Sequence, residues 1–286
     1  METAFNPYVL HVMIVSLYYV ILTSSWNVIA GMTGFATYSH AAFAALGAYA
    51  SAYFSLHLGF PLALSIPLAT LSGALFGGLL GKLCLRLSGT YLALLTLSFS
   101  ELLRLVLTNE DQVTRGSLGL RVAELFTSES SEPLTQKIRT LALFGVVVIV
   151  LLTLIARLRR SRLGLHLRAI LSDELAARSL GVRTERLRIL VFTGSSAIAS
   201  LGGALFGHYL GLITPEMGGL PQMFLILAMT IWGGIGTFFG PVAGAILLEV
   251  LSESLRGFGQ AHVLIYALLI LVVYRFRPQG LFGGRS

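Results

Sequence analysis

The feature that most constrains this chain is a series of apolar segments that recurs from one end of the sequence to the other. A helix needs roughly 20 residues to cross a hydrocarbon core of about 30 Å, and segments of that order follow one another here. Backbone inside a membrane must satisfy its own hydrogen bonds, so only helices or a closed barrel can span it. Barrel strands alternate apolar and polar residues, whereas ALFGVVVIVLLTLI (residues 142–155) does not alternate. The sequence therefore predicts an all-α, polytopic integral membrane protein.

Breaks between the apolar runs predict a bundle of about eight to nine transmembrane or re-entrant helices. The second segment is rich in Gly and Ser, so a broken or re-entrant form is an alternative to a full span there. The candidate spans are Tyr8–Ala30, Thr33–Leu56, Phe60–Leu83, Thr90–Thr108, Arg139–Arg157, Ile189–Leu210, Leu220–Phe239, Pro241–Leu255 and His262–Arg275.

Basic residues predict the orientation of these spans. Nine of the twenty Lys and Arg lie in the loop 157–188, and further basic residues lie in the turn 82–86 and at 275–285. All three stretches fall on one side if the spans are counted as above, and an excess of Lys and Arg marks the cytoplasmic side. We therefore expect one domain, residues 1–286, with a cytoplasmic loop 157–188, a cytoplasmic tail 276–286 and an external N-terminus. The net charge of +7 is interpreted as a topology signal and not as a nucleic-acid surface.

Motifs for catalysis are not found in the sequence. The text nearest to a phosphate-binding loop, FGGLLGKL (residues 76–83), lacks the first Gly and the final Ser or Thr. The single cysteine excludes a multi-cysteine metal site, and the six histidines show no metal-binding spacing. We expect no enzyme activity, no catalytic residue, no cofactor and no metal.

Ionisable residues within the spans are the candidates for a polar role in the membrane. Glu101 and Arg104 lie three residues apart, on one face of a helix, and are expected to pair. Glu249 has no basic neighbour within helical reach, so an interhelical hydrogen bond and a place on a translocation path are equally good interpretations. His40 is included with them as an intramembrane polar residue. Glycines expected to break helices or to pack them closely are Gly31, Gly34, Gly234, Gly236 and Gly240.

A charged stretch, residues 166–188, interrupts the apolar sequence and contains residues typical of helix caps. Ser172 is suited to the N-cap, acidic residues follow it, Arg178 would occupy the last turn and Gly181 would close the helix. So short a helix is marginal alone and must dock against something. The residues alone leave two alternatives open, a protein partner or the lipid headgroups. The surface expected to pack consists of Leu171, Leu175, Ala176, Ala177 and Leu180.

The segment SRLGLHLRAILSDELAARSLGV (residues 161–182) resembles the cytoplasmic loop of permease subunits from branched-chain amino acid ABC importers of the LivM type. TGFATYSHAAFAALGAYASA, GTYLALLTLSFSELLRLVLTN, GGIGTFFGPVAGA and FRPQGLFG are similar to other landmarks of that family, in the same order. The resemblance implies that residues Ala169 to Gly181 form a coupling helix, although Leu171 and Ser172 depart from the family pattern. Its implied coupling residues are Ala169, Asp173, Glu174, Ala177, Arg178, Leu180 and Gly181.

The resemblance also implies a function. It predicts a permease subunit of an ATP-driven importer for branched-chain or other hydrophobic amino acids in the bacterial inner membrane. The implied partners are a second related permease, two ATPase subunits and an external binding protein, with membrane lipid around them and no nucleic acid. A permease of the same family for urea, short amides or other small solutes is the alternative, and an ion-coupled secondary transporter is a further one.

Overall fold

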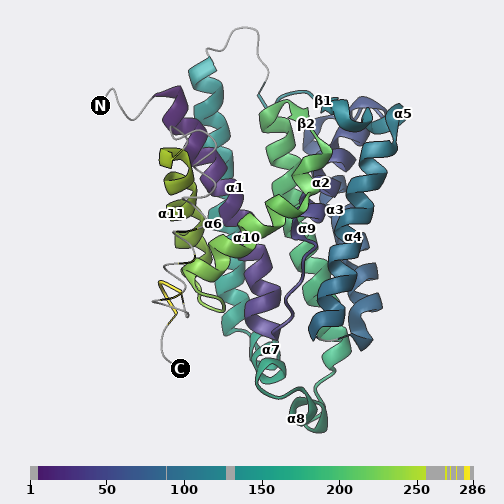
Figure 1. The fold of residues 1–286 in the computed structure, drawn as a ribbon, viewed down its shortest axis with the longest axis vertical. Coiled ribbons are helices and arrows are strands. Elements are labelled where there is room, and N and C mark those ends of the chain that lie inside the picture. The colour runs from purple at the N-terminus through teal and green to yellow at the C-terminus, as the bar shows by residue number, and fades with distance from the viewer. Residues whose placement is uncertain are drawn as a thin grey trace.

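The computed structural model describes residues 6–87, 89–126, 133–255, 268, 271, 275 and 280–283. Within them the chain is a bundle of helices with one short β-ladder, as Figure 1 shows. The elements are α1 (Pro7–Thr33), α2 (His40–Leu56), α3 (Leu62–Leu83), η2 (Cys84–Arg86), α4 (Gly89–Asn109), α5 (Asp111–Thr114), η3 (Gly116–Leu118), β1 (Leu120–Arg121), α6 (Pro133–Arg160), α7 (Arg162–Ser172), α8 (Glu174–Ser179), α9 (Thr184–Leu210), β2 (Leu212–Ile213), η4 (Pro215–Gly218), α10 (Leu220–Gly233) and α11 (Gly240–Leu255).

Five of these helices are long and apolar enough to cross a membrane: α1, α3, α4, α6 and α9. They contain 21 to 27 residues in their apolar spans, which at about 1.5 Å per residue exceeds the thickness of a hydrocarbon core. Figure 1 places α7 and α8 at one end of the bundle and the β1–β2 pair at the other. The predicted all-α, multi-pass membrane protein is confirmed.

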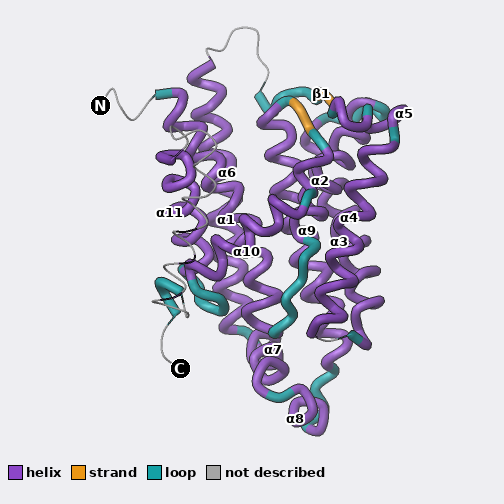
Figure 2. Tube along the Cα trace, viewed as in Figure 1, coloured by secondary structure: helices purple, strands orange, loops and turns teal. Residues whose placement is uncertain are grey.

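Two predicted spans, Thr33–Leu56 and Leu220–Phe239, are shorter than expected, and the physical reason is a helix break in each region. The second segment is helical only from His40, because Gly34 adopts φ 75° and ends α1. Residues 34–39 then run as extended chain inside the bundle (Figure 2). The seventh span ends at Gly233 and not at Phe239, so α10 has 14 residues, and α11 has 16. The broken form expected as an alternative therefore describes the second segment correctly.

The extended segment keeps its backbone hydrogen-bonded through α4. The N–H of Tyr38 donates to Thr96 Oγ1 at 3.0 Å, and Ser100 Oγ donates to the carbonyl of Tyr38 at 2.9 Å. Trp26 Nε1 donates to the carbonyl of Thr37 at 2.8 Å. Non-helical backbone is tolerated at membrane depth only where protein or water satisfies it, and here three neighbouring side chains do so.

Small residues hold α2, α3 and α9 together. A Cβ placed on Gly73 or Gly77 of α3 would collide with Ser200 or Ser196 of α9. Gly203 of α9 lies equally close to the backbone of α2. Removing the Cβ allows helix backbones to approach, which is how membrane helices gain packing energy without a hydrophobic driving force. These glycines therefore allow α2, α3 and α9 to pack closely.

The ninth predicted span, His262–Arg275, and most of the tail 276–286 lie outside the described residues, apart from isolated positions. The segment 280–283 is described and packs against the end of α10. The N–H groups of Leu281 and Phe282 donate to the carbonyls of Trp232 and Gly233 at 2.9 and 3.0 Å.

Candidate coupling region and intramembrane polar groups

The basic loop contains two helices where the sequence predicts one. α7 begins after Ser161, whose side chain accepts from the N–H of Gly164, and buries Gly164, Leu167 and Ile170 against the bundle. This buried face carries the helix on through Ser172, so Ser172 is the last residue of α7 and not an N-cap. Ala169, half-buried in α7, accepts the N–H of Asp173 in the closing hydrogen bond. The expected continuous helix from Ala169 to Gly181 is therefore wrong.

Asp173 is the true N-cap of α8. Its backbone is extended, with φ −156° and ψ 110°, and its carboxylate accepts from the N–H groups of Leu175 and Ala176 at 2.8 and 3.0 Å. At the other end Gly181 has φ +83° and donates to Arg178, while Val182 donates to Ala177. These two hydrogen bonds complete a Schellman motif, for which a residue in the left-handed region is needed. The predicted helix-closing role of Gly181 is confirmed.

The exposed surface around α8 differs from the predicted one at a single residue, Ala177. Ala177 is only 3% exposed because it packs inside the chain itself, so it cannot form the contact surface that the sequence interpretation assigned to it. Leu171, Leu175 and Leu180 are 47%, 76% and 85% exposed. Exposed apolar side chains of this size mark interaction surfaces when they cluster in a polar region. These three leucines are called the tip leucines below.

Arg188, which the sequence interpretation missed, joins α8 to the bundle. It lies in the second turn of α9 with a side chain 8% exposed and forms an ion pair with Glu174 of α8. Its Nη1 donates to the carbonyl of Leu85 in η2 at 3.2 Å, and its guanidinium stacks 4.1 Å from the ring centroid of Phe35. Arg178 also donates to Glu174, at 2.8 Å. One buried cation thus links α8, the α3–α4 turn and the segment that leads to α2.

Two of the predicted glycines, Gly31 and Gly236, meet at the end of α1 that lies nearest to α7. A Cβ on Gly31 would lie 2.7 Å from Cα of Gly236, so the two backbones touch. The side chain of Asn27 accepts from the N–H of Gly236 at 2.7 Å and donates to the carbonyl of Thr237 at 2.8 Å. Arg159 donates to the carbonyl of Gly236 at 2.9 Å. Close packing therefore explains Gly31, whereas Gly34 and Gly234 break helices and Gly240 begins α11.

His40 lies in a buried polar cluster at the start of α2. Its Nε2 is 2.6 Å from Ser195 Oγ of α9, and its Nδ1 is 3.4 Å from Thr37 Oγ1. Ser25 Oγ of α1 donates to the carbonyl of Ser195 at 2.6 Å. These contacts tie the broken second segment to α1 and α9. The serine pairs in TSSWN and TGSSA were the signal that sequence reasoning missed, because small hydroxyl residues bridge helices in membranes.

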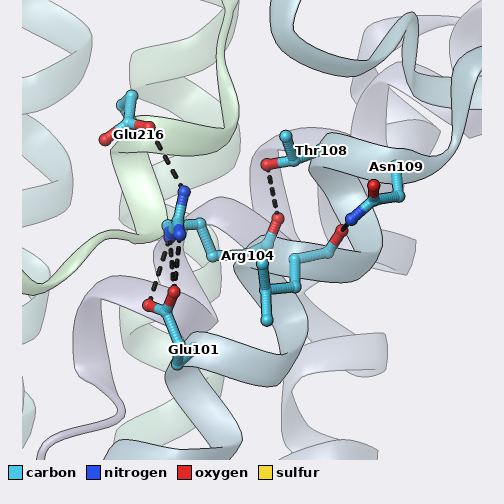
Figure 3. Close-up of polar contacts among 6 residues, drawn as sticks. Glu101, Arg104, Thr108, Asn109 and Glu216 are labelled. Carbon is cyan, nitrogen blue, oxygen red and sulfur yellow. Dashed lines mark hydrogen bonds and ion pairs between the residues drawn. The ribbon is translucent and has the colours of Figure 1, made fainter.

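Glu101 and Arg104 form the expected pair on α4, as Figure 3 shows. Arg104 Nη2 lies 2.5 Å from Glu101 Oε1, and Nε lies 3.1 Å from Oε2. A third group, Glu216 of η4, lies 3.4 Å from Arg104 Nη1. Sequence reasoning missed Glu216 because it is 112 residues away along the chain.

Glu249 lines a cavity of about 280 Å³ between α1, α9, α10 and α11. His11 of α1 and Leu210 of α9 line it too, and both also line a second cavity of about 460 Å³ beside α6. Tyr19 on the cavity wall accepts from Gln222 at 2.9 Å. Polar groups of several helices thus line two neighbouring cavities near the end of the bundle opposite α8.

Comparison with known sequences identifies the family to which this helical bundle belongs. The profile of a family described as "Branched-chain amino acid transport system / permease component" matches residues 8–273. The chain belongs to this family. The permease family assignment covers almost every described element, from α1 through α11.

Three relatives are similar to this chain over different parts of its length. The high-affinity branched-chain amino acid transport system permease protein LivM of Escherichia coli is 33% identical over 285 residues, 92% of this chain and 67% of the relative. Its counterpart LivH is 32% identical over 186 residues, 62% of this chain and 60% of the relative. The fructose import permease protein FrcC of Rhizobium meliloti is 34% identical over 140 residues, 45% of this chain and 39% of the relative. No solved structure matches the chain.

Proposed function

We propose that this chain is the membrane-spanning permease subunit of an ATP-driven importer for branched-chain or other hydrophobic amino acids in a bacterial inner membrane. A second related permease, two ATPase subunits and an external binding protein would complete the importer. The chain would hydrolyse no ATP itself, because its sequence lacks the phosphate-binding loop that ATPases need.

The observation that carries the proposal is the construction of α8. Figure 1 shows α8 projecting beyond the adjacent ends of α1, α3 and α4. A helix resting on lipid headgroups would lie level with those ends and place its apolar side toward the membrane. Leu175 of α8 and Leu180 at its C-cap are instead exposed on this extramembrane projection, which favours a groove on a protein partner.

Motion of the docked partner would reach the membrane through Arg188. When α8 shifts, Glu174 moves with it, and the buried ion pair transmits the shift to α9, to the carbonyl of Leu85 and to Phe35. Phe35 lies in the extended segment before α2, where no helical hydrogen bonds resist bending. ATP-driven closure of the ATPases could thereby bias two arrangements of the bundle, which is what alternating access requires.

The substrate class rests on the relatives, since LivM and LivH are named for branched-chain amino acids. FrcC, named for fructose import, matches a smaller part of the chain, so the family alone does not fix the cargo. The broken helices α2 and α10 resemble those of ion-coupled secondary transporters, but membership of the permease family argues against that alternative.

Uptake in proteoliposomes tests the proposal. Vesicles containing the chain, its related permease and both ATPases, with ATP inside and binding protein outside, should accumulate labelled leucine and not labelled fructose. Vesicles without the ATPases should accumulate neither. Leucine uptake without ATPases, driven by an ion gradient, would contradict the proposal.

A further inference from the structure

The outward faces of three membrane-crossing helices differ in composition. In each of α3, α4 and α6, only 22% of the residues in the most apolar stretch are buried within the chain. The exposed large side chains of α3 and α6 are hydrocarbon in character, as at Leu75 (63%) and Ile149 (66%), and suit a lipid surface. α4 carries Leu102 (61%) but also exposes Ser98 and Asn109 and bears the Glu101–Arg104 pair.

The charged groups of α4 remain partly open at the surface of the chain. The side chains of Glu101, Arg104 and Glu216 are 35%, 24% and 73% exposed. Glu101 lies eight residues from the end of α4 at Asn109, about 12 Å along a helix, and so lies within the span. Hydrocarbon does not solvate ionised groups, and such residues in membrane proteins face protein or water.

The backbone beside this cluster also indicates that this side of α4 is covered by protein or water and not by lipid. Glu216 belongs to η4, a short turn between β2 and α10 that contacts α4. Irregular backbone does not face lipid within the hydrocarbon region. Over α4 itself lies a shallow hollow of about 580 Å³, lined by Glu101, Asn109 and apolar side chains that include Leu102, Leu105 and Val106. An apolar surface with a few polar groups is the composition of a protein interface.

We propose that α4, with η4 beside it, forms the contact with a second permease subunit that is related to this chain but not identical. The proposal rests on the proposed function, which supplies a paired permease. Two carboxylates and one guanidinium give the cluster a net charge of −1. In a twofold pair of identical chains, this negative cluster would meet its own copy wherever it lies at the symmetry axis, whereas a related chain can present donors or a cation there. LivM and LivH, both similar to this chain, show that such distinct relatives exist.

Photo-cross-linking in the assembled importer tests the interface. A photoreactive phenylalanine derivative is placed at Leu102, or at the matched controls Leu75 and Ile149, which are equally exposed on α3 and α6. The chain is co-expressed with the tagged related permease. We expect an adduct between the two permeases from position 102 and none from 75 or 149. An adduct between two copies of this chain from position 102, or an adduct with the tagged permease from a control position only, overturns the proposal.

A second arm uses bulk in place of a cross-linker. A Trp side chain is tolerated where it faces lipid, but it obstructs a closely packed protein contact. Leu102→Trp should therefore lower recovery of the tagged permease at least fivefold, while Leu75→Trp should not change the recovery. Equal recovery with both variants overturns the interface. If the unmodified chain recovers the tagged permease and the ATPases but position 102 gives no adduct, the interface alone is wrong. If the unmodified chain recovers no second permease, the proposed function fails as well.

Discussion

Replacing Arg188 by Met should detach α8 from the bundle without unfolding the membrane helices. The substitution keeps much of the aliphatic volume but removes the cation that binds Glu174, donates to Leu85 and stacks on Phe35. Hydrogen bonds to charged groups contribute about 1.5–3 kcal/mol, and a cation–π contact contributes about 0.5–2 kcal/mol. Breaking a fully buried ion pair costs about 3–5 kcal/mol, but Glu174 keeps its bond to Arg178 and is 30% exposed. We therefore expect a net loss of about 2–4 kcal/mol in the stability of the α8 attachment, because these contributions are not additive.

Hydrogen exchange of the α8 amides measures this loss. At about 1.4 kcal/mol for each factor of ten, the open population should rise by about 30-fold to 700-fold. Arg186→Met is the matched control, since Arg186 lies in the same turn of α9 and is exposed, so its exchange should change little. Exchange in α8 that differs by less than threefold between Arg188→Met and Arg186→Met would refute the role given to Arg188.

Three further predictions concern the membrane helices. Gly203→Ala should sharply lower folded yield, because the added Cβ would overlap the backbone of α2. Gly194→Ala in the same helix has open space around the added Cβ and should be neutral or stabilising by roughly 0.5–1 kcal/mol. Thermal unfolding in detergent compares the two variants. Glu101→Ala should lower folded yield more than Glu101→Leu combined with Arg104→Met, since the single change leaves Arg104 with only the exposed Glu216 at 3.4 Å, and equal yields would argue against a simple pair. Glu249→Gln should reduce leucine uptake at unchanged yield if its cavity lies on the translocation path, and unchanged uptake would leave it a structural role.

Local sequence patterns predicted most of the fold because membrane helices are specified by length and composition. The apolar run of α6 and the basic loop after it needed no tertiary information. Helix ends inside the membrane were harder to predict. Gly34 signals a break, but contacts with Trp26, Thr96 and Ser100, distant in sequence from one another, explain how the backbone after it stays hydrogen-bonded without a helix.

The coupling region shows where sequence reasoning fails. Ser172 and Asp173 are both residue types that favour an N-cap. Which of them caps α8 depends on where α7 ends, and packing of the buried face of α7 extends that helix through Ser172. Ala177 and Leu180 both look like contact residues in the sequence, but the fold buries one and exposes the other. Arg188 is one basic residue among nine in that loop, and its burial depends on contacts with Phe35 and Leu85 that are distant in sequence.

The central claim is that the tip leucines dock on an ATPase subunit, and a matched pair of lysine substitutions tests it most directly. Leu180 on the α8 tip is 85% exposed, and Leu118 at the opposite end of the bundle is 86% exposed. Lysine at either position remains solvated, so neither change should affect folding or membrane insertion. The account predicts that Leu180→Lys lowers co-purification of the ATPase subunits and binding-protein-stimulated ATP hydrolysis at least tenfold, while Leu118→Lys leaves the ATPases bound. ATPase recovery and stimulated hydrolysis that are the same for both variants would contradict it.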